Sequence, residues 1–140
     1  MKRLFLILSI LLTAAFSSNA QMYLFHTDAT SNSQYSKYYE KYISNNLKPR
    51  SIKVRVYYNT NQILINDYDS LLYILEGDTF NNPLFPSEPN NEYCYTARDQ
   101  DELKCTVHLL TDKDMSKWII IQYINMIYSY RLQSNHTIYD

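Results

Sequence analysis

Hydrophobic and polar residues alternate from Ser51 onward, which is the pattern of β-strands with one buried face. Ile52, Val54 and Val56 are separated by longer, more polar side chains. Because successive side chains of a strand point to opposite faces, this spacing predicts a half-buried strand over 52–57. Further apolar runs follow, separated by short polar turns. They predict strands over 62–66, 71–75, 92–97, 103–110, 118–124 and 127–132.

Consecutive strands without intervening helices are typical of an antiparallel meander. The chain is therefore predicted to be mainly β, with about seven strands in a curled sheet or a small barrel. Residues 81–91 interrupt the pattern, since Pro83, Pro86 and Pro89 fall within them. Proline cannot donate to a central β-ladder, so this segment is expected to form a surface loop.

One segment ahead of the strands has a different period. Residues 22–26 could open the fold as a short strand, and 27–33 form a polar connector. Apolar and aromatic residues then recur at i, i+3, i+4, i+7 and i+8, which predicts an N-terminal α-helix over about 34–45. Its stripe would pack on the sheet or grip a ligand. The stripe consists of Tyr35, Tyr38, Tyr39, Tyr42 and Ile43.

The two cysteines fall in the predicted hairpin between 92–97 and 103–110. A four-residue loop at 98–101 would place Cys94 opposite Cys105 at a non-hydrogen-bonded pair. The Cα atoms of such a pair lie about 4.5 Å apart, a separation that a disulfide spans. The spacing therefore predicts a Cys94–Cys105 disulfide. No histidine stands at zinc-ligand spacing from them, so no metal site is predicted.

The first residues resemble an export signal. Lys2 and Arg3 precede an apolar run over 4–12, and Ser18 and Ala20 supply the small residues of a cleavage site. The run is shorter than the roughly 20 residues that a membrane span needs. We therefore expect a signal peptide over 1–20, cut after Ala20, and a secreted or periplasmic protein without a membrane span. Such compartments permit disulfides.

The remaining chain has the length of one domain. We expect a β-rich domain over 21–132 and a flexible polar tail over 133–140. The formal net charge is −1 and no basic cluster is present, which argues against nucleic acid as a partner. The single glycine, Gly77, excludes a glycine-rich phosphate loop.

The sequence offers little sign of catalysis. His26, His108 and His136 are dispersed, a Gly-x-Ser-x-Gly motif is absent, and a disulfide would remove both thiols as nucleophiles. Acidic residues gather at the predicted turns, where they ordinarily cap the backbone. We therefore expect a non-enzymatic protein with no catalytic residues and no cofactor.

Aromatic residues on the last two strands form the best candidate site. Trp118, Tyr123, Tyr128 and Tyr130 lie there, and a turn at Asn125–Met126 would place Tyr123 opposite Tyr128. These rings would either pack the core or bind a small hydrophobic ligand against the curved sheet. The partner is accordingly an unknown small molecule or protein.

Two other functions stay open from the residues alone. One is a small secreted hydrolase that uses turn carboxylates or His108. The other is an inhibitor that blocks a secreted enzyme through the proline-rich loop over 81–91.

Two segments resemble small exported β-proteins of the Bacteroidota. The run Ile52-Lys-Val-Arg-Val-Tyr-Tyr-Asn-Thr-Asn-Gln-Ile-Leu-Ile65 resembles their first hairpin. Residues 104–110 and 121–130 are similar to their C-terminal strands, and the Ala20–Gln21 junction also suits the group. The family has no assigned activity, so the resemblance implies a fold and a compartment but no site residue.

Overall fold

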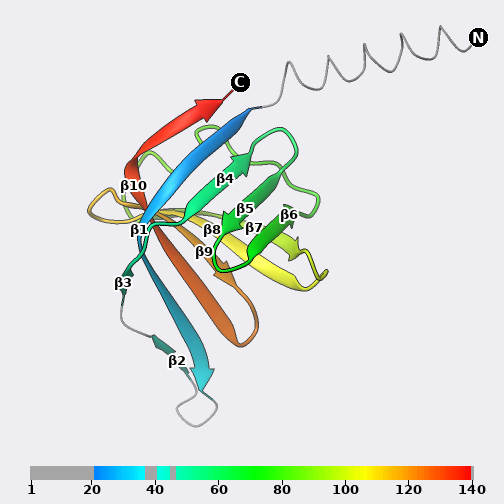
Figure 1. Ribbon diagram of the computed structural model, residues 1–140, viewed down its shortest axis with the longest axis vertical. Coiled ribbons are helices and arrows are strands. Elements are labelled where there is room, and N and C mark those ends of the chain that lie inside the picture. Colours follow the sequence, from blue (N-terminus) through cyan, green and yellow to red (C-terminus); the bar gives the residue numbers. More distant parts are fainter. Residues whose placement is uncertain (1–20, 37–40, 45–46, 140) are drawn as a thin grey trace, which may run out of the picture.

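The computed structural model describes residues 21–36, 41–44 and 47–139 of the chain (Figure 1). The predicted signal peptide over 1–20 lies outside these residues. The described part is built from strands. They are β1 (Met22–Ser36), β2 (Lys41–Ser44), β3 (Lys48–Pro49), β4 (Lys53–Tyr57), β5 (Gln62–Asn66), β6 (Ser70–Leu75), β7 (Asn91–Asp99), β8 (Lys104–Thr111), β9 (Lys117–Gln122) and β10 (Met126–Tyr139).

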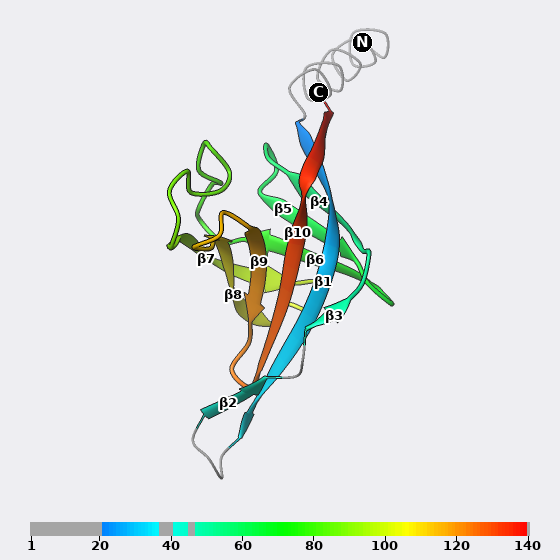
Figure 2. The ribbon, with the colours of Figure 1, turned by 90° about the vertical axis from the view of Figure 1, so that its left-hand side faces the viewer.

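The strands form a closed antiparallel barrel. From β4 to β10 each strand pairs with the next, and β1 pairs with both β4 and β10. Eight strands thus form the ring, while β2 and β3 pair with β1 outside it. Figure 2 shows the long strands β1 and β10 side by side along the wall of the barrel.

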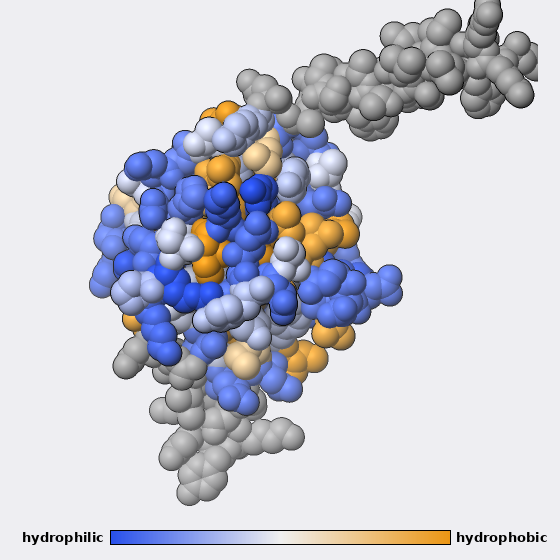
Figure 3. All heavy atoms as spheres, viewed as in Figure 1, coloured by the Kyte–Doolittle hydropathy of each residue, from blue (hydrophilic) through white to orange (hydrophobic). Residues whose placement is uncertain are grey.

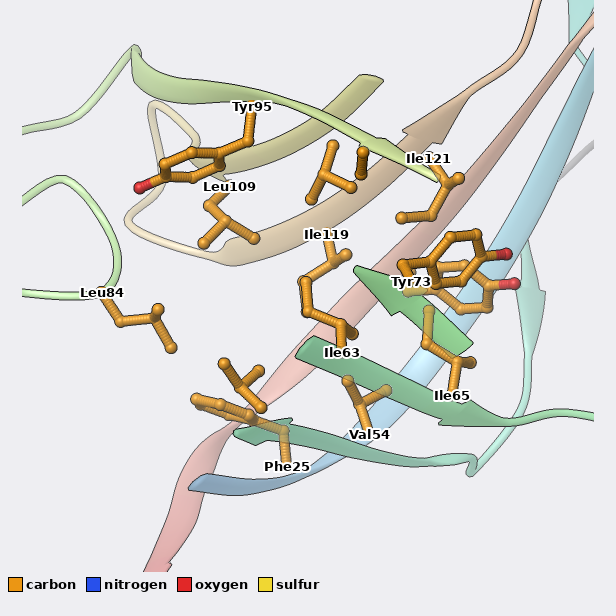
Figure 4. Close-up of a cluster of buried hydrophobic side chains, with 14 of the residues drawn as sticks. Phe25, Val54, Ile63, Ile65, Tyr73, Leu84, Tyr95, Leu109, Ile119 and Ile121 are labelled. Atoms are coloured by element: carbon orange, nitrogen blue, oxygen red, sulfur yellow. The ribbon is translucent and has the colours of Figure 1, made fainter. Parts of the chain in front are cut away.

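Side chains fill the barrel interior. Inward-facing residues alternate along each strand, and an eight-stranded barrel is just wide enough for such side chains to meet. Figure 4 shows them converging from strands on different sides of the barrel. The fully buried set includes Val54, Val56, Ile63, Ile65, Tyr73, Val107, Leu109, Ile119, Ile121 and Tyr130.

The proline-rich segment between β6 and β7 closes one end of the barrel. It contains no strand, which confirms the prediction of a loop. Phe80, Leu84 and Phe85 on this loop are buried, and Leu84 approaches the core residues in Figure 4. The buried Thr111 hydroxyl donates to the Pro86 carbonyl oxygen at 2.6 Å and fastens the loop to β8.

The alternation from residue 51 onward predicted most of the barrel correctly. Each of the seven predicted strands matches one of β4–β10, with starts within one residue of those expected. In β4 and β8, burial alternates from residue to residue as the pattern required. The antiparallel meander is confirmed, and the ring closes through β1.

The predicted helix over 34–45 is wrong in the residues that the structure describes. Residues 34–36 end β1 and 41–44 form β2, while 37–40 and 45 lie outside the described part. The backbone register places Tyr35 opposite Tyr42. Residues 27–33, expected to be a connector, also belong to β1. The pairing of β1 with β10 reaches Gln34, so β1 continues through the polar residues 27–33. The local sequence pattern of these residues does not indicate a strand.

The predicted Cys94–Cys105 disulfide is also wrong. Both cysteines are free. Cys94 lies opposite His108, and Cys105 lies opposite Ala97, so the partner of Cys94 is three residues beyond the expected one. A shift by an odd number of residues turns a side chain to the other face of the sheet. Cys105 therefore points into the barrel and Cys94 outward.

The turn between β7 and β8 explains this register. The Glu102 N–H donates to the Asp99 carbonyl oxygen at 3.0 Å, and Glu102 takes a left-handed conformation at φ 63°. The Asp99 carboxylate also accepts the N–H groups of Asp101 at 2.9 Å and Leu103 at 3.0 Å. These bonds stabilise a three-residue loop with a bulge, a common hairpin connection, instead of the four-residue loop expected.

The domain does not end at Leu132 as expected. Residues 133–139 continue β10, and four of them pair with Met22–Phe25 at the start of β1. The first residues of β1 and the last residues of β10 are thus held together by backbone pairing. Within the described residues, no helix has the length and apolar character needed to cross a membrane.

Candidate functional site

A cavity of about 450 Å³ lies beside the proline-rich loop, outside the filled core. Three parts of the chain form its walls: the beginning of β1, the second half of β10 and loop residues 82–87. Lys117 at the start of β9 completes the lining. Cavities of this size are typical of sites for small molecules.

Aromatic rings form one wall of the cavity. Tyr23 and Phe25 are two residues apart and therefore lie on the same face of β1. Their rings stack with centroids 6.3 Å apart. His136, opposite Phe25 on β10, lies 5.2 Å from the Phe25 ring, and Phe85 of the loop meets Phe25 edge to face at 5.8 Å. Ile138 adds a half-exposed aliphatic side chain. This wall suits a flat or aliphatic apolar body.

Lys117 brings a positive charge to the same cavity. Its Nζ donates to the Thr111 hydroxyl at 3.0 Å and to the Pro86 carbonyl oxygen at 3.3 Å. An ammonium group has three donors, so one is left for a ligand. Burial lowers the pKa of Lys117, and no carboxylate of the described residues forms an ion pair with it. A bound anion would supply the missing countercharge.

The four aromatic residues predicted to bind a ligand do not form one site. Trp118 faces outward, where its indole N–H donates to the Ser116 hydroxyl at 3.0 Å. Tyr123 and Tyr128 meet edge to face at 6.1 Å, although β9 and β10 place Tyr128 opposite Ile121. None of the four lines the cavity beside the loop. Their role in ligand binding stays a prediction.

Tyr128 and Tyr130 instead line a separate, more polar cavity of about 320 Å³. Arg50 and Asp67 form an ion pair there, and the Arg50 guanidinium lies 4.6 Å from the centre of the exposed Tyr68 ring. Because this arginine already has a carboxylate partner and a ring, the cavity offers a ligand less unsatisfied charge than the one at Lys117 does.

Tyr123 and Tyr130 differ in how their hydroxyls are satisfied. The Tyr123 hydroxyl donates to the Asp99 carboxylate at 2.8 Å, whereas the buried Tyr130 hydroxyl has no partner within the described residues. We expect Tyr130→Phe to leave the free energy of unfolding unchanged or to raise it. Tyr123→Phe should lower it by about 2 kcal/mol, because it removes a hydrogen bond to a charged group. Urea unfolding of both variants checks this. Equal losses would contradict the assignment.

Sequence reasoning missed a cluster on the outer wall. Glu92 and Cys94 share a face of β7, and His108 lies opposite Cys94 on β8. The His108 Nδ1 lies 3.2 Å from both the Cys94 sulfur and a Glu92 carboxylate oxygen. Desolvation, followed by the hydrogen bond to Glu92, raises the pKa of the Cys94 thiol, which opposes its use as a nucleophile.

The cavity beside the loop was also missed, for a different reason. Its wall on β10 was assigned to a polar tail, and its floor depends on contacts between residues more than a hundred positions apart. The short strand expected over 22–26 was the one available local signal, because Tyr23 and Phe25 share a face in any strand.

Comparison of the chain with protein-family models, with curated proteins and with solved structures finds no significant match. The resemblance to exported Bacteroidota proteins therefore stays a prediction.

Proposed function

We propose that this chain is an exported, non-enzymatic binding protein for a small amphipathic anion. The ligand would be a carboxylate with an apolar body, held in the cavity beside the proline-rich loop. Its body would lie against Tyr23, Phe25 and Phe85, and its carboxylate would accept a hydrogen bond from Lys117. The observation that carries the proposal is a partly buried ammonium group, without an ionic partner in the described residues, at the edge of an aromatic wall.

Both parts of the cavity support this ligand class. An apolar chain would cover surface that the partly buried Tyr23 and the half-exposed Ile138 otherwise leave toward solvent. A charge-assisted hydrogen bond at Lys117 is worth about 1.5–3 kcal/mol, enough to favour an acid over the corresponding alcohol by about tenfold or more.

Small clusters of apolar residues interrupt the hydrophilic surface in the view of Figure 3, rather than one continuous patch. A broad hydrophobic protein interface on this face has little support. The inhibitor hypothesis is weakened as well, because Phe80, Leu84 and Phe85 of the proline-rich loop pack inward against the barrel. The hydrolase hypothesis has no observation in its favour, since His108 meets one carboxylate on an open wall.

The test compares decanoate with decanol by isothermal titration calorimetry. The wild-type chain should bind decanoate about tenfold more tightly than decanol. Lys117→Met keeps the length of the side chain but removes the charge, so it should abolish this difference and leave decanol binding unchanged. Thr111 still fastens the loop in this variant, because its bond to Pro86 does not involve Lys117.

A matched pair of variants locates the site. Ser134 lines the cavity and Asn135 does not, although both are exposed on β10. Ser134→Trp should fill the cavity and abolish binding of both ligands, whereas Asn135→Trp should bind them as the wild type does. Equal affinity for acid and alcohol in the wild type, or normal binding by Ser134→Trp, would overturn the proposal.

A further inference from the structure

We propose that Glu92, Cys94 and His108 form a zinc site on the outer wall of the barrel. The three residues make up the one group of this kind in the described part of the chain whose ligand atoms all lie within 4.8 Å of one another. The site is separate from the cavity beside the loop and does not depend on what that cavity binds.

The strands hold the three ligands rigidly. Residues 92 and 94 lie on one face of β7 because their spacing is two, and the register with β8 sets His108 directly across from Cys94. Glu92 and Cys94 are paired with β8, and His108 is paired with both β7 and β9. A sheet thus brings together a sulfur, an imidazole nitrogen and a carboxylate, a donor set that zinc accepts.

Two of the three distances between the ligand atoms lie near those of a tetrahedral zinc site, and the third is within 4.8 Å. With usual zinc–ligand bond lengths, donor atoms of such a site lie about 3.3–3.6 Å apart. Here the His108 Nδ1 is 3.2 Å from the Cys94 sulfur and 3.2 Å from the Glu92 oxygen. Small movements of the exposed Glu92 and Cys94 side chains toward the partly buried His108 would admit the ion, and water would take the fourth position.

A neighbour on β9 orients the histidine for this role. The His108 Nε2 lies 2.9 Å from the Gln122 amide oxygen, so Nε2 carries a proton and donates it. In neutral imidazole, Nδ1 then keeps its lone pair toward Cys94 and Glu92. Metal-binding histidines are usually fixed by such a second hydrogen bond. The Cys94 sulfur, the His108 Nδ1 and a Glu92 oxygen therefore converge on one point. Without a metal, the Cys94 thiol is the one group among them that can donate a proton.

Cobalt offers a direct test, because a thiolate bound to Co²⁺ gives a charge-transfer absorption band. The untagged wild-type chain, kept reduced, should develop this band on titration with Co²⁺ and lose it when Zn²⁺ is added. Cys94→Ser and His108→Gln should each weaken Co²⁺ binding by more than about 100-fold, and Gln122→Leu by about 10- to 100-fold.

Cys105 provides the matched control, since it is the other thiol of the chain and points into the barrel. Cys105→Ala should retain the full band. Far-ultraviolet circular dichroism establishes that each variant is folded, and Zn²⁺ should raise the thermal midpoint of the wild type but not of Cys94→Ser. A wild-type chain without the band, or a band that persists in Cys94→Ser, would overturn the site.

Discussion

Replacing Ile121 by alanine should lower the free energy of unfolding by about 4 kcal/mol. Ile121 is fully buried, and its side chain points into the barrel among residues from several strands (Figure 4). Its β9 backbone lies between β8 and β10, opposite Val107 and Tyr128. Because the interior is filled from all sides, the barrel cannot collapse onto the space that the lost atoms leave.

Ile120 is the matched control for this prediction. It is the adjacent residue on β9, carries the same side chain and faces outward, where it is only partly buried. Ile120→Ala should lower the free energy of unfolding by about 1 kcal/mol. Guanidinium unfolding of the two variants measures the difference. Similar losses at both positions would show that the inside and outside of β9 are assigned incorrectly.

Thr27→Val should lower the free energy of unfolding by about 3 kcal/mol, although the two side chains have nearly the same shape. The Thr27 hydroxyl is fully buried, donates to the Arg50 carbonyl oxygen at 2.7 Å and accepts the Ile52 N–H at 2.9 Å. These two hydrogen bonds lie just beyond the point where the pairing of β1 with β4 ends. The register between β1 and β10 is also irregular at Thr27. Valine would leave the buried Ile52 N–H and the partly buried Arg50 carbonyl oxygen without this partner.

Thr27→Ser separates the hydroxyl from the methyl group. Serine keeps both hydrogen bonds, so it should lower the free energy of unfolding by only about 1 kcal/mol. Urea unfolding of the three chains checks the order wild type, serine, valine. A valine variant as stable as the serine variant would show that the hydroxyl is not needed at this bend.

Local alternation was enough to predict the barrel strands from β4 to β10. In β4 and β5 the buried residues recur every second position between short polar turns, so the pattern reports directly which face is inside. The same information predicted only the first residues of β1, as a short strand over 22–26. The residues near its end match a helical period, and their strand conformation follows from pairing with β10, at the other end of the chain.

Register was the second quantity that the sequence left undetermined. Asp99 and Glu102 together select a bulged three-residue loop, and a glycine that would mark such a loop is absent from it. The resulting shift separates Cys94 from Cys105 and brings Cys94 to His108. The loop at 100–102 replaces the expected loop at 98–101 and shifts the register by three residues, so a candidate metal site stands in place of the expected disulfide.

The cavity could not be predicted because it combines distant segments. Phe25, Phe85, Lys117 and His136 come from four parts of the chain, and only barrel closure brings them together. Periodicity shows which face of a strand is apolar but not which loop will cover the end of a barrel. Of the four predicted aromatic residues, Tyr123 and Tyr128 contact each other, and none of the four lines this cavity.

Intermolecular nuclear Overhauser effects would show where the acid binds, in a sample of the labelled chain saturated with decanoate. We expect contacts from the decanoate methylene protons to the rings of Phe25 and Phe85 and to the Ile138 methyl groups, together with a shift of the Lys117 side-chain resonances. Contacts to Tyr128 and Tyr68 at the other cavity, or the absence of contacts to Phe25 and Phe85, would rule out binding beside the proline-rich loop.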